Sequence, residues 1–278
     1  MIQLGRFNTL TVVKHVEFGA FLDGGEAGEI LLPRREVDDS VQVDEEISVF
    51  IYLDSKDRPI ATFRKPKIQV GGFAYLKVVD VNRVGAFLDW GLEKDLMVPF
   101  AEQNTPMEVG QSYIVTMYID SLDLRPTASS KIDKFLVEEN NKTFKTNEQV
   151  ELLIASNTDL GLKAIINQSH WGLIFKDDIS KRLSYGDTVS GFVKQIRGDD
   201  KINIALEKTT EIRDRQSQQI IDFLVKEGGF AGVHDKSDPN LIRKLFGMSK
   251  SAFKKAIGGL YKKGDIVIES TGIRLIEK

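Results

Sequence analysis

The sequence lacks features on which several large classes of protein depend. It contains no cysteine, which excludes disulfide bridges, thiolate metal sites and cysteine nucleophiles, and favours a reducing compartment. No apolar run approaches the roughly 18 residues that a membrane-spanning helix needs, and no secretion signal follows Met1. We therefore expect a cytoplasmic protein with no membrane contact.

The sequence also lacks a recognisable catalytic or metal-binding arrangement. The three histidines, His15, His170 and His234, are scattered, show no metal-ligand spacing and belong to no nucleophile motif. Adjacent aspartates occur only in polar, turn-like stretches, where solvated acids are the usual explanation. We therefore predict that the protein is not an enzyme and holds no metal or other cofactor.

An excess of basic charge is missing as well. The 278 residues carry 38 basic and 41 acidic side chains, a net charge of −3 at pH 7, whereas general polyanion binders are normally basic. The distribution is uneven, because residues 1–66 carry 8 basic and 12 acidic side chains while residues 211–278 carry 13 and 9. Phosphate contacts are therefore expected first near the C-terminal end.

What the sequence does contain is an internal repeat. The segment Gly19-Ala20-Phe21-Leu22-Asp23 recurs 66 residues later as Gly85-Ala86-Phe87-Leu88-Asp89. The same offset aligns identical residues at further positions, among them Val12 with Val78, Pro33 with Pro99, Tyr52 with Tyr118, and Asp54 with Asp120. One inserted residue then aligns Arg58 with Arg125. So many matches at one offset indicate a duplication.

Each copy has the pattern of short alternating strands separated by turns rich in glycine and aspartate. The strands predicted for the first copy are Leu10–Val16, Gly19–Asp23, Gly28–Pro33, Ile47–Leu53 and Pro59–Phe63. A third, more diverged copy is predicted from strands at Val150–Ser156, Gly161–Ile166, Gly172–Phe175, Asp187–Gln195 and Lys201–Leu206. Five short strands in about 60 residues are typical of a small closed barrel, which leaves no sheet edge exposed.

After residue 210 the apolar residues change to a helical spacing. One helix is predicted around Ile220, and a second runs from Pro239 to Phe246, behind the capping candidate Asp238. Ser249 caps a third helix, and two short strands follow at Ile266–Glu269 and Ile273–Ile276. Three helices and a hairpin in this order predict a winged helix-turn-helix.

The predicted fold is therefore multidomain and mainly β. It consists of three five-stranded barrels of the OB type at residues 1–65, 68–130 and 145–208, followed by an α+β winged helix-turn-helix at residues 211–278. The polar linker between the second and third barrels is expected to form a short helix around Phe135.

The first copy resembles the S1 RNA-binding domain, a five-stranded OB-type barrel. The resemblance rests on the segments 16–22 and 28–32 and on Asp54 and Arg58. It implies that RNA contacts the aromatic side chains of Phe18 and Phe21 together with Asp54 and Arg58. A histidine that the family uses on the same face is replaced here by Leu31.

The other copies keep only part of this pattern. The second copy retains Phe87, Asp120 and Arg125 as the residues that the resemblance implies for RNA binding. It has Val84 and Met97 where the first copy has Phe18 and Leu31. In the third copy the motif has become Gly161-Leu162-Lys163, so the residues expected to bind RNA are Lys163, Phe175 at the histidine position, and Lys201 near the arginine position.

Three such repeats followed by a winged helix, in this order and length, resemble the conserved virulence factor B family of Gram-positive bacteria. The resemblance extends over nearly the whole chain. It implies a non-catalytic protein that binds single-stranded RNA and acts in post-transcriptional regulation of virulence gene expression.

Strand alternation supports the same aromatic residues independently of the resemblance. Phe21 lies on the same side of its strand as Asp23, and a core does not readily accept an aspartate, so Phe21 is expected to face outwards. An exposed aromatic side chain can stack a base for about 1–3 kcal/mol. Alternatively, these aromatics seal contacts between repeats, as Trp90 could. In the same way, Arg58 and Arg125 could simply pair with the neighbouring Asp54 and Asp120.

The C-terminal lysines are candidates for contact with a nucleic-acid backbone. Lys250 and Lys254 lie one turn apart on the third helix, and Lys255, Lys262 and Lys263 add charge towards the wing. No cluster of side chains suited to base reading lies on this helix. Two other functions stay open, a DNA-binding transcription regulator acting through the winged helix and a protein-interaction scaffold. The oligomeric state is also left open.

Overall fold

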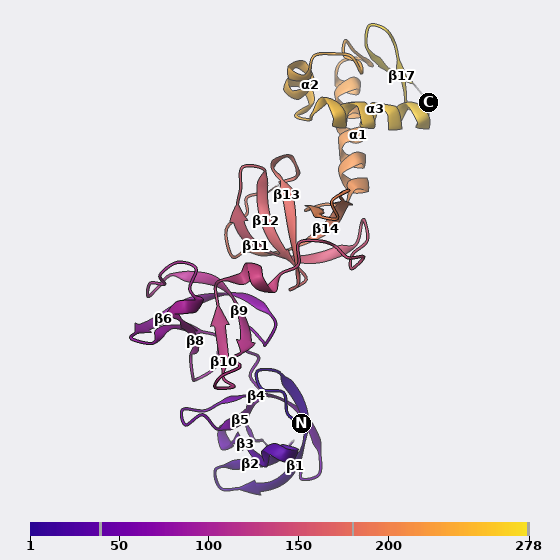
Figure 1. Cartoon of the computed structure of the whole chain (residues 1–278). Coiled ribbons are helices and arrows are strands. Elements are labelled where there is room, and N and C mark those ends of the chain that lie inside the picture. Colours follow the sequence, from indigo (N-terminus) through magenta and orange to yellow (C-terminus); the bar gives the residue numbers. More distant parts are fainter. Residues whose placement is uncertain (39–40, 180, 277–278) are drawn as a thin grey trace.

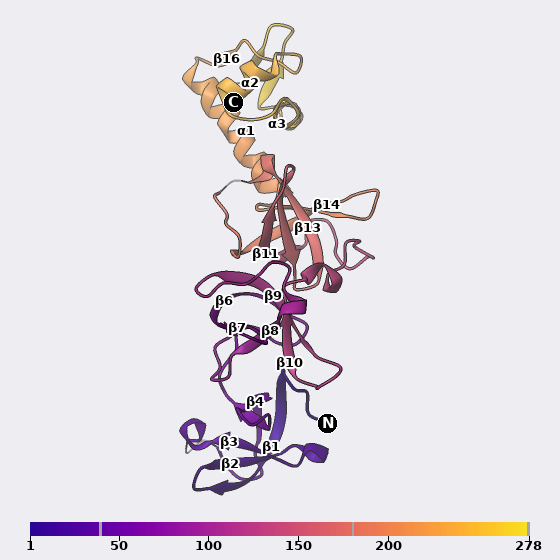
Figure 2. The ribbon, with the colours of Figure 1, turned by 60° about the vertical axis from the view of Figure 1, so that its left-hand side comes forward.

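The computed structural model describes residues 1–38, 41–179 and 181–276. Four units follow one another in a row, with the N-terminus in the first barrel and the C-terminus in the helical unit at the opposite end (Figures 1 and 2). The predicted fold class, three β-barrels followed by a winged helix, is confirmed. The domain boundaries given above stay predictions.

The first and third barrels are closed and share one topology. The first consists of β1 (Phe7–Val16), β2 (Gly19–Asp23), β3 (Glu29–Pro33), β4 (Glu46–Leu53) and β5 (Pro59–Thr62). The third consists of β11 (Gln149–Asn157), β12 (Gly161–Ile166), β13 (His170–Phe175), β14 (Thr188–Ile196) and β15 (Ile202–Ala205). In spatial order these are β1-β2-β3-β5-β4 and β11-β12-β13-β15-β14. The third copy therefore keeps the fold although its motif has diverged.

The second barrel is nearly closed. Its strands are β6 (Phe73–Asn82), β7 (Gly85–Asp89), β8 (Leu96–Pro99), β9 (Ser112–Ile119) and β10 (Pro126–Ser129), in the spatial order β10-β9-β6-β7-β8. The outer strands β8 and β10 lie side by side without a regular ladder between them in this described part of the chain. Short 3-10 helices lie at Gly25–Ala27, Arg34–Glu36, Phe100–Glu102, Ile132–Phe135 and Lys176–Asp178.

One glycine recurs in all three barrels for a steric reason. Gly19, Gly85 and Gly161 each begin the second strand of their barrel. A Cβ atom at any of these positions would collide with a backbone carbonyl oxygen of the following strand. The oxygens belong to Leu32, Val98 and Ile174, respectively. This close approach explains why Gly161 remains in the third copy, where the rest of the motif has been replaced.

The first two barrels share a hydrophobic core. On β4, Val49 and Ile51 point into the first barrel, whereas Phe50 and Tyr52 point outwards and pack against the second barrel. Trp90, which follows β7, is 3% exposed and lies with its ring centroid 5.8 Å from that of Phe50. Trp90 therefore packs against the neighbouring repeat, which was one of its two predicted roles.

A second inter-barrel contact joins the second and third barrels. Phe73 and Ile114 of the second barrel form a buried cluster with Ile165 and Trp171 of the third. The Tyr185 hydroxyl accepts a hydrogen bond of 2.8 Å from the Ile114 amide across this contact. The three barrels are thus packed against one another rather than only tethered.

The C-terminal unit contains the predicted helices and hairpin, together with one short strand that was not predicted. Its elements are α1 (Thr209–Lys226), β16 (Phe230–Ala231), α2 (Pro239–Phe246), α3 (Lys250–Lys263), β17 (Ile266–Ile268) and β18 (Ile273–Leu275). Asp238 caps α2 by accepting hydrogen bonds from two backbone amides, and Ser249 caps α3, so both predicted caps are confirmed. The missed strand β16 pairs with β18.

The first half of α1 connects the third barrel to the winged-helix core. No side chain described between residues 211 and 219 is buried, whereas Ile220 and Leu224 lie fully within the core. Figure 1 shows the helix crossing the space between the two units. Within the described ranges, no helix is long and apolar enough to cross a membrane.

Candidate nucleic-acid interface

Strand register defines an equivalent outward face in each barrel. In the first barrel Phe21 on β2 is opposite Leu31 on β3, which lies beside Ile60 on β5. We call these three positions the strand face. In the third barrel they are Lys163, Leu173 and Asn203. In the second barrel Phe87 is opposite Met97.

This register corrects the position predicted for Phe175. Phe175 pairs with Gly161, as Pro33 pairs with Gly19, so Phe175 is equivalent to Pro33. Leu173 occupies the position of Leu31 instead. The prediction that Phe175 takes the histidine position is therefore wrong, because the diverged third motif offered no landmark for aligning the strand that follows. Phe175 is half-buried.

The position predicted for Lys201 is confirmed by its turn. The Arg197 amide donates to the Lys201 carbonyl oxygen at 2.9 Å, as the Asp54 amide donates to the Arg58 carbonyl oxygen at 2.9 Å in the first barrel. Both turns join the last two strands of their barrel. Arg197 thus stands where the first barrel has Asp54, and its guanidinium lies 3.0 Å from Asp199 of the same turn.

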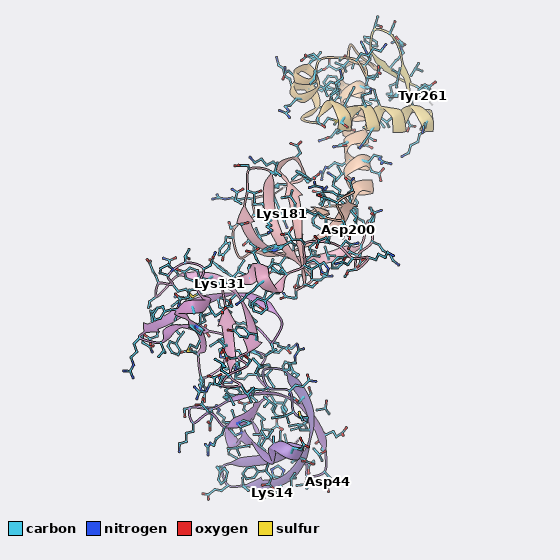
Figure 3. The ribbon with its side chains drawn as sticks, viewed as in Figure 1. Lys14, Asp44, Lys131, Lys181, Asp200 and Tyr261 are labelled. Carbon is cyan, nitrogen blue, oxygen red and sulfur yellow. The ribbon has the colours of Figure 1, made fainter. Side chains whose placement is uncertain are left out.

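An aromatic pair lies at the surface of the first barrel. Phe18 is 58% exposed, and its ring meets the half-buried ring of Phe21 edge to face, with centroids 6.0 Å apart. Lys14 lies at the outer end of the molecule (Figure 3), with its Nζ 5.1 Å from the Phe21 centroid and 2.8 Å from a Glu29 carboxylate oxygen. The sequence reasoning did not select Lys14.

The equivalents of Phe18 are exposed in the other barrels too. Val84 is 51% exposed, and Leu160, which precedes Gly161, is 60% exposed. Each barrel therefore presents an apolar side chain at the turn before its second strand. Only in the first barrel is this side chain aromatic, whereas Phe87 of the second barrel is half-buried.

The Asp54–Arg58 turn is internally paired. One Asp54 carboxylate oxygen accepts from the backbone amides of Lys56 and Arg58, and the other accepts from the Arg58 guanidinium at 2.7 and 2.9 Å. Burial alone would raise the pKa of Asp54, but these hydrogen bonds hold the pKa below its usual range. The alternative in which Arg58 pairs with Asp54 is therefore confirmed.

Arg125 has a different partner from the one expected. Its guanidinium donates to Asp57 of the first barrel at 2.7 Å and lies 3.7 Å from Asp123, while the Asp120 carboxylate accepts from the Leu122 amide. The expectation that Arg125 pairs with Asp120 is wrong, because the two barrels pack so that Asp57 faces the Arg125 side chain. Arg125 therefore links two barrels in addition to any contact with a ligand.

The strand face of the third barrel lines a pocket of about 400 Å³. Lys163, Leu173 and Asn203 contribute to its wall, as do Lys201 of the turn between β14 and β15 and the buried ring of Trp171. The sequence reasoning missed Trp171 and Asn203. Strand alternation places Trp171 on the same face as Phe175, and Asn203 on the same face as Lys201, so both could have been found from the sequence.

A carboxylate from the linker lies between the two lysines of this pocket. Glu138 is 3.2 Å from Lys163 Nζ and 3.3 Å from Lys201 Nζ. Burial alone would raise the pKa of Glu138, but the hydrogen bonds and charges of the two lysines hold it below its usual range. No sequence pattern pointed to Glu138, because its role depends on how the linker lies on the third barrel.

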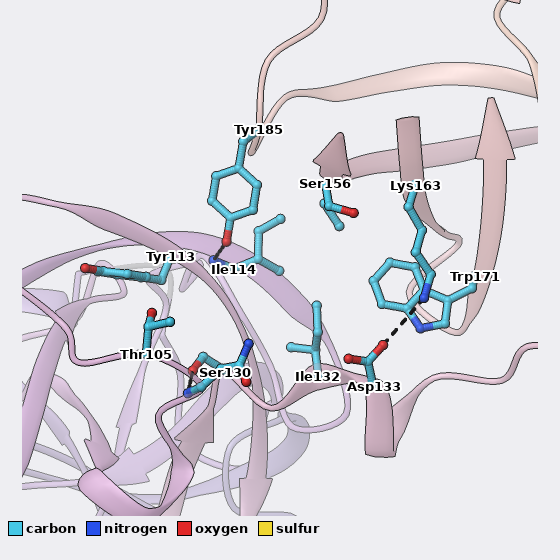
Figure 4. A pocket seen from close by; sticks show the side chains of 12 residues that line it. Thr105, Tyr113, Ile114, Ser130, Ile132, Asp133, Ser156, Lys163, Trp171 and Tyr185 are labelled. Carbon is cyan, nitrogen blue, oxygen red and sulfur yellow. Dashed lines mark hydrogen bonds and ion pairs between the residues drawn. The ribbon is translucent and has the colours of Figure 1, made fainter. Parts of the chain in front are cut away.

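A smaller pocket of about 260 Å³ lies between the second and third barrels (Figure 4). Tyr113 of the second barrel and Tyr185 of the third line it, together with Asp133 of the linker. Lys163 and Trp171 line both pockets, and Lys163 Nζ lies 3.9 Å from the Trp171 ring. The two pockets therefore adjoin at this lysine and tryptophan.

The five C-terminal lysines fall into two groups. Lys250 Nζ donates to the Lys236 carbonyl oxygen at 3.2 Å, and Lys254 lies 4.0 Å from Asp235. The remaining three are exposed and form no ion pair within the part of the chain that the structure describes; they are Lys255, Lys262 and Lys263. These three are the ones available to a phosphate backbone. Tyr261, more than half exposed, lies on the same helix (Figure 3).

No metal site is present among residues 1–38, 41–179 and 181–276. Nowhere in these ranges do three or more histidine, aspartate or glutamate side chains converge in a way that could hold an ion. The site chemistry of the described chain consists of aromatic rings, lysines and one bridging carboxylate.

Comparisons with known proteins identify the units. The S1 domain family matches residues 4–64, and the CvfB-like winged helix domain matches residues 218–275. A protein named conserved virulence factor B from Staphylococcus epidermidis is 30% identical over 268 residues, which cover 92% of this chain and 89% of that protein. The Bacillus subtilis protein YitL is 29% identical over 281 residues, which cover 96% and 91%.

A solved structure aligns over the same length. It is the crystal structure of a multidomain protein with nucleic acid binding domains from Streptococcus pneumoniae, and it matches 98% of each chain at 22% identity and a TM-score of 0.41.

Proposed function

This chain belongs to the conserved virulence factor B family, and on that premise we propose that it is a non-catalytic protein that binds single-stranded RNA. Both matched domain types, S1 and winged helix, are nucleic-acid-binding domains. The proposal includes action in the cytoplasm on transcripts, and thereby post-transcriptional regulation of gene expression, virulence genes among them.

The exposed aromatic pair on the first barrel carries the proposal. Phe18 keeps 58% of its surface in water, although covering a phenylalanine is worth about 1.5–3 kcal/mol. A base stacked on such a ring contributes about 1–3 kcal/mol, so Phe18 and Phe21 together supply roughly 2–6 kcal/mol before ordering costs. That range corresponds to weak binding by one barrel. Tandem barrels raise the overall affinity through effective concentration.

The test compares RNA binding by variants with matched exposed phenylalanines. Fluorescence anisotropy of a labelled single-stranded RNA and of a duplex DNA is measured with the full chain. The Phe18→Ala/Phe21→Ala variant should bind the RNA at least about tenfold more weakly, a loss of about 1.4 kcal/mol. Phe100→Ala serves as the control, because Phe100 is 54% exposed but lies in the 3-10 helix that follows β8 of the second barrel. Equal binding by all three proteins would refute the role of the first barrel.

Salt dependence separates stacking from electrostatic binding. The first barrel has few cations near its aromatic pair, with Lys14 the nearest, so about 3–4 phosphate contacts are expected for the chain. On single strands this number gives a log–log slope of roughly −2 to −3 against salt. A much steeper slope would show that phosphate contacts, rather than stacking, provide most of the affinity.

The exposed lysines of α3 favour a second candidate function, DNA binding by the winged helix. A variant with Lys255, Lys262 and Lys263 replaced by glutamine tests it in the same assay. Stronger binding to duplex DNA than to RNA, lost in this variant, would identify a DNA-binding transcription regulator. Absence of binding to both nucleic acids would instead favour a protein-interaction scaffold. The Lys250 and Lys254 side chains, already partly engaged within the domain, are expected to matter less.

A further inference from the structure

Two buried polar atoms in the third barrel have no hydrogen-bond partner within residues 1–38, 41–179 and 181–276. They are the Trp171 indole Nε1, in a residue 6% exposed, and the Asn203 Oδ1, in a residue 7% exposed. Leaving a buried donor or acceptor unpaired destabilises the folded protein, because the group loses its hydrogen bonds to water and gains none in return. Both residues line the 400 Å³ pocket. Both atoms are covered, Trp171 in part by Lys163, whose Nζ lies 3.9 Å from the ring centroid, so a ligand that displaces the covering side chains meets one donor and one acceptor that the protein itself does not satisfy.

The rest of the pocket combines apolar surface with positive charge. Leu173 forms part of the wall, and Leu160, which is 60% exposed, lies at the edge of the same pocket. Lys163 and Lys201 add two ammonium groups. The volume lies within the range of about 300–1,000 Å³ that is usual for small-molecule sites. A flat, polar-edged group that carries an anion matches this combination.

The anion position is already occupied by a side chain of the protein. Glu138 bridges the two lysines, at 3.2 and 3.3 Å. It belongs to the linker between β10 and β11, not to the barrel. The linker is held there by short backbone bridges, from Val137 to His170 and from Glu139 to Lys201. A phosphate that binds both lysines must therefore displace the Glu138 carboxylate.

We propose that the third barrel binds one nucleotide of the RNA in this pocket, with Trp171 and Asn203 hydrogen-bonding the base and its phosphate displacing Glu138. This inference rests on the proposed function for the class of ligand, a ribonucleotide. It differs in mechanism from the first barrel, because stacking accepts every base, whereas a fixed donor and acceptor select among base edges. The linker carboxylate acts as a competitor that excludes weakly bound anions.

The indole N–H signals of the protein provide the test. The chain has two tryptophans, so an ¹⁵N-labelled sample of the full chain shows two indole signals, and Trp171→Phe assigns them. Adenosine, guanosine, cytidine and uridine 5′-monophosphates are titrated separately, with ribose 5-phosphate as the probe that lacks a base. At least one nucleotide should shift the Trp171 signal at millimolar concentration. The Trp90 signal should not move, because its Nε1 already donates to the Lys94 carbonyl oxygen.

Variants of equal charge test the role of Glu138. Glu138→Gln should tighten nucleotide binding severalfold, whereas the control Glu139→Gln removes the same charge from the adjacent residue and should have little effect. Asn203→Ala should weaken nucleotide binding about tenfold, or 1.4 kcal/mol. Circular dichroism checks that each variant is folded.

Three outcomes would overturn the proposal. They are an unmoved Trp171 signal with all four nucleotides, a response to ribose 5-phosphate equal to that of the nucleotides, and equal effects of the two glutamine variants. The indole signal reports on the third barrel alone, whereas the anisotropy experiment with Phe18 and Phe21 reports on the first. A failure of the pocket and a failure of the proposed RNA stacking site are therefore distinguishable.

Discussion

Replacement of Trp90 by alanine tests whether the first two barrels form one structural unit. Trp90 belongs to the second barrel and is 3% exposed. Its ring lies edge to face with Phe50 and Tyr52 of the first barrel, at centroid distances of 5.8 and 6.4 Å. Its Nε1 donates to the Lys94 carbonyl oxygen at 2.6 Å. The substitution removes all of these contacts together.

The expected loss is large and falls on the contact between the barrels. Truncation of a packed tryptophan to alanine costs about 3–5 kcal/mol. Phe50 and Tyr52 point away from the core of their own barrel, so the first barrel keeps its internal packing, whereas the second barrel also loses the contacts that Trp90 makes within its own core. The equilibrium between docked and separated barrels should therefore shift by at most roughly a hundred- to a few-thousand-fold. Trp90→Phe keeps a ring and should have an intermediate effect.

Limited trypsin digestion measures this shift directly. The linker between the barrels contains Lys67, whose amide donates to the Trp90 carbonyl oxygen, and Ile68, which is 4% exposed. In Trp90→Ala, cleavage after Lys67 should become much faster, and small-angle X-ray scattering should show a larger radius of gyration with an unchanged circular dichroism spectrum. Leu122→Ala is the control, because Leu122 is 93% exposed. Unchanged cleavage and scattering in Trp90→Ala would refute the reasoning.

Three further predictions concern single positions. Burial lowers the pKa of His170 in the folded protein. The stability that the neutral His170 contributes is therefore complete above the unfolded-state pKa of about 6.5, and it is lost as the pH falls from 6.5 towards the lower folded-state pKa. His170→Gln should flatten the decline in thermal midpoint on acidification. Gly161→Ala should destabilise the third barrel by about 1–3 kcal/mol or more in urea unfolding, because the new Cβ meets the Ile174 carbonyl oxygen at a positive φ. Asp57→Asn should leave the thermal midpoint nearly unchanged, because its pair with Arg125 is exposed and screened by solvent.

The sequence alone determined the architecture of this protein because that architecture depends on local and periodic signals. The duplicated Gly-Ala-Phe-Leu-Asp segment marked the same strand in two barrels. The predicted bounds of β2, β12 and α2 agree with the structure. The caps Asp238 and Ser249 were also readable, because capping depends on one side chain and the amides that follow it.

Within the third barrel the sequence was sufficient for the fold but not for the site. Lys201 was placed correctly because it lies in a turn with a fixed backbone pattern. Phe175 was placed wrongly, because a strand without its motif can be shifted by two residues and still keep the same side chains facing outwards. Leu173 and Asn203 entered the candidate site only once the hydrogen-bonded register was known.

Only the tertiary structure decided what each outward-facing side chain meets. Alternation along a strand distinguishes the inside of a barrel from its outside, and it places both Phe21 and Phe50 on the outside. It does not reveal that Phe50 is covered by Trp90, or that Arg125 reaches Asp57. These contacts depend on how separately folded units pack, so they join residues far apart in the chain and leave no periodic trace in the sequence.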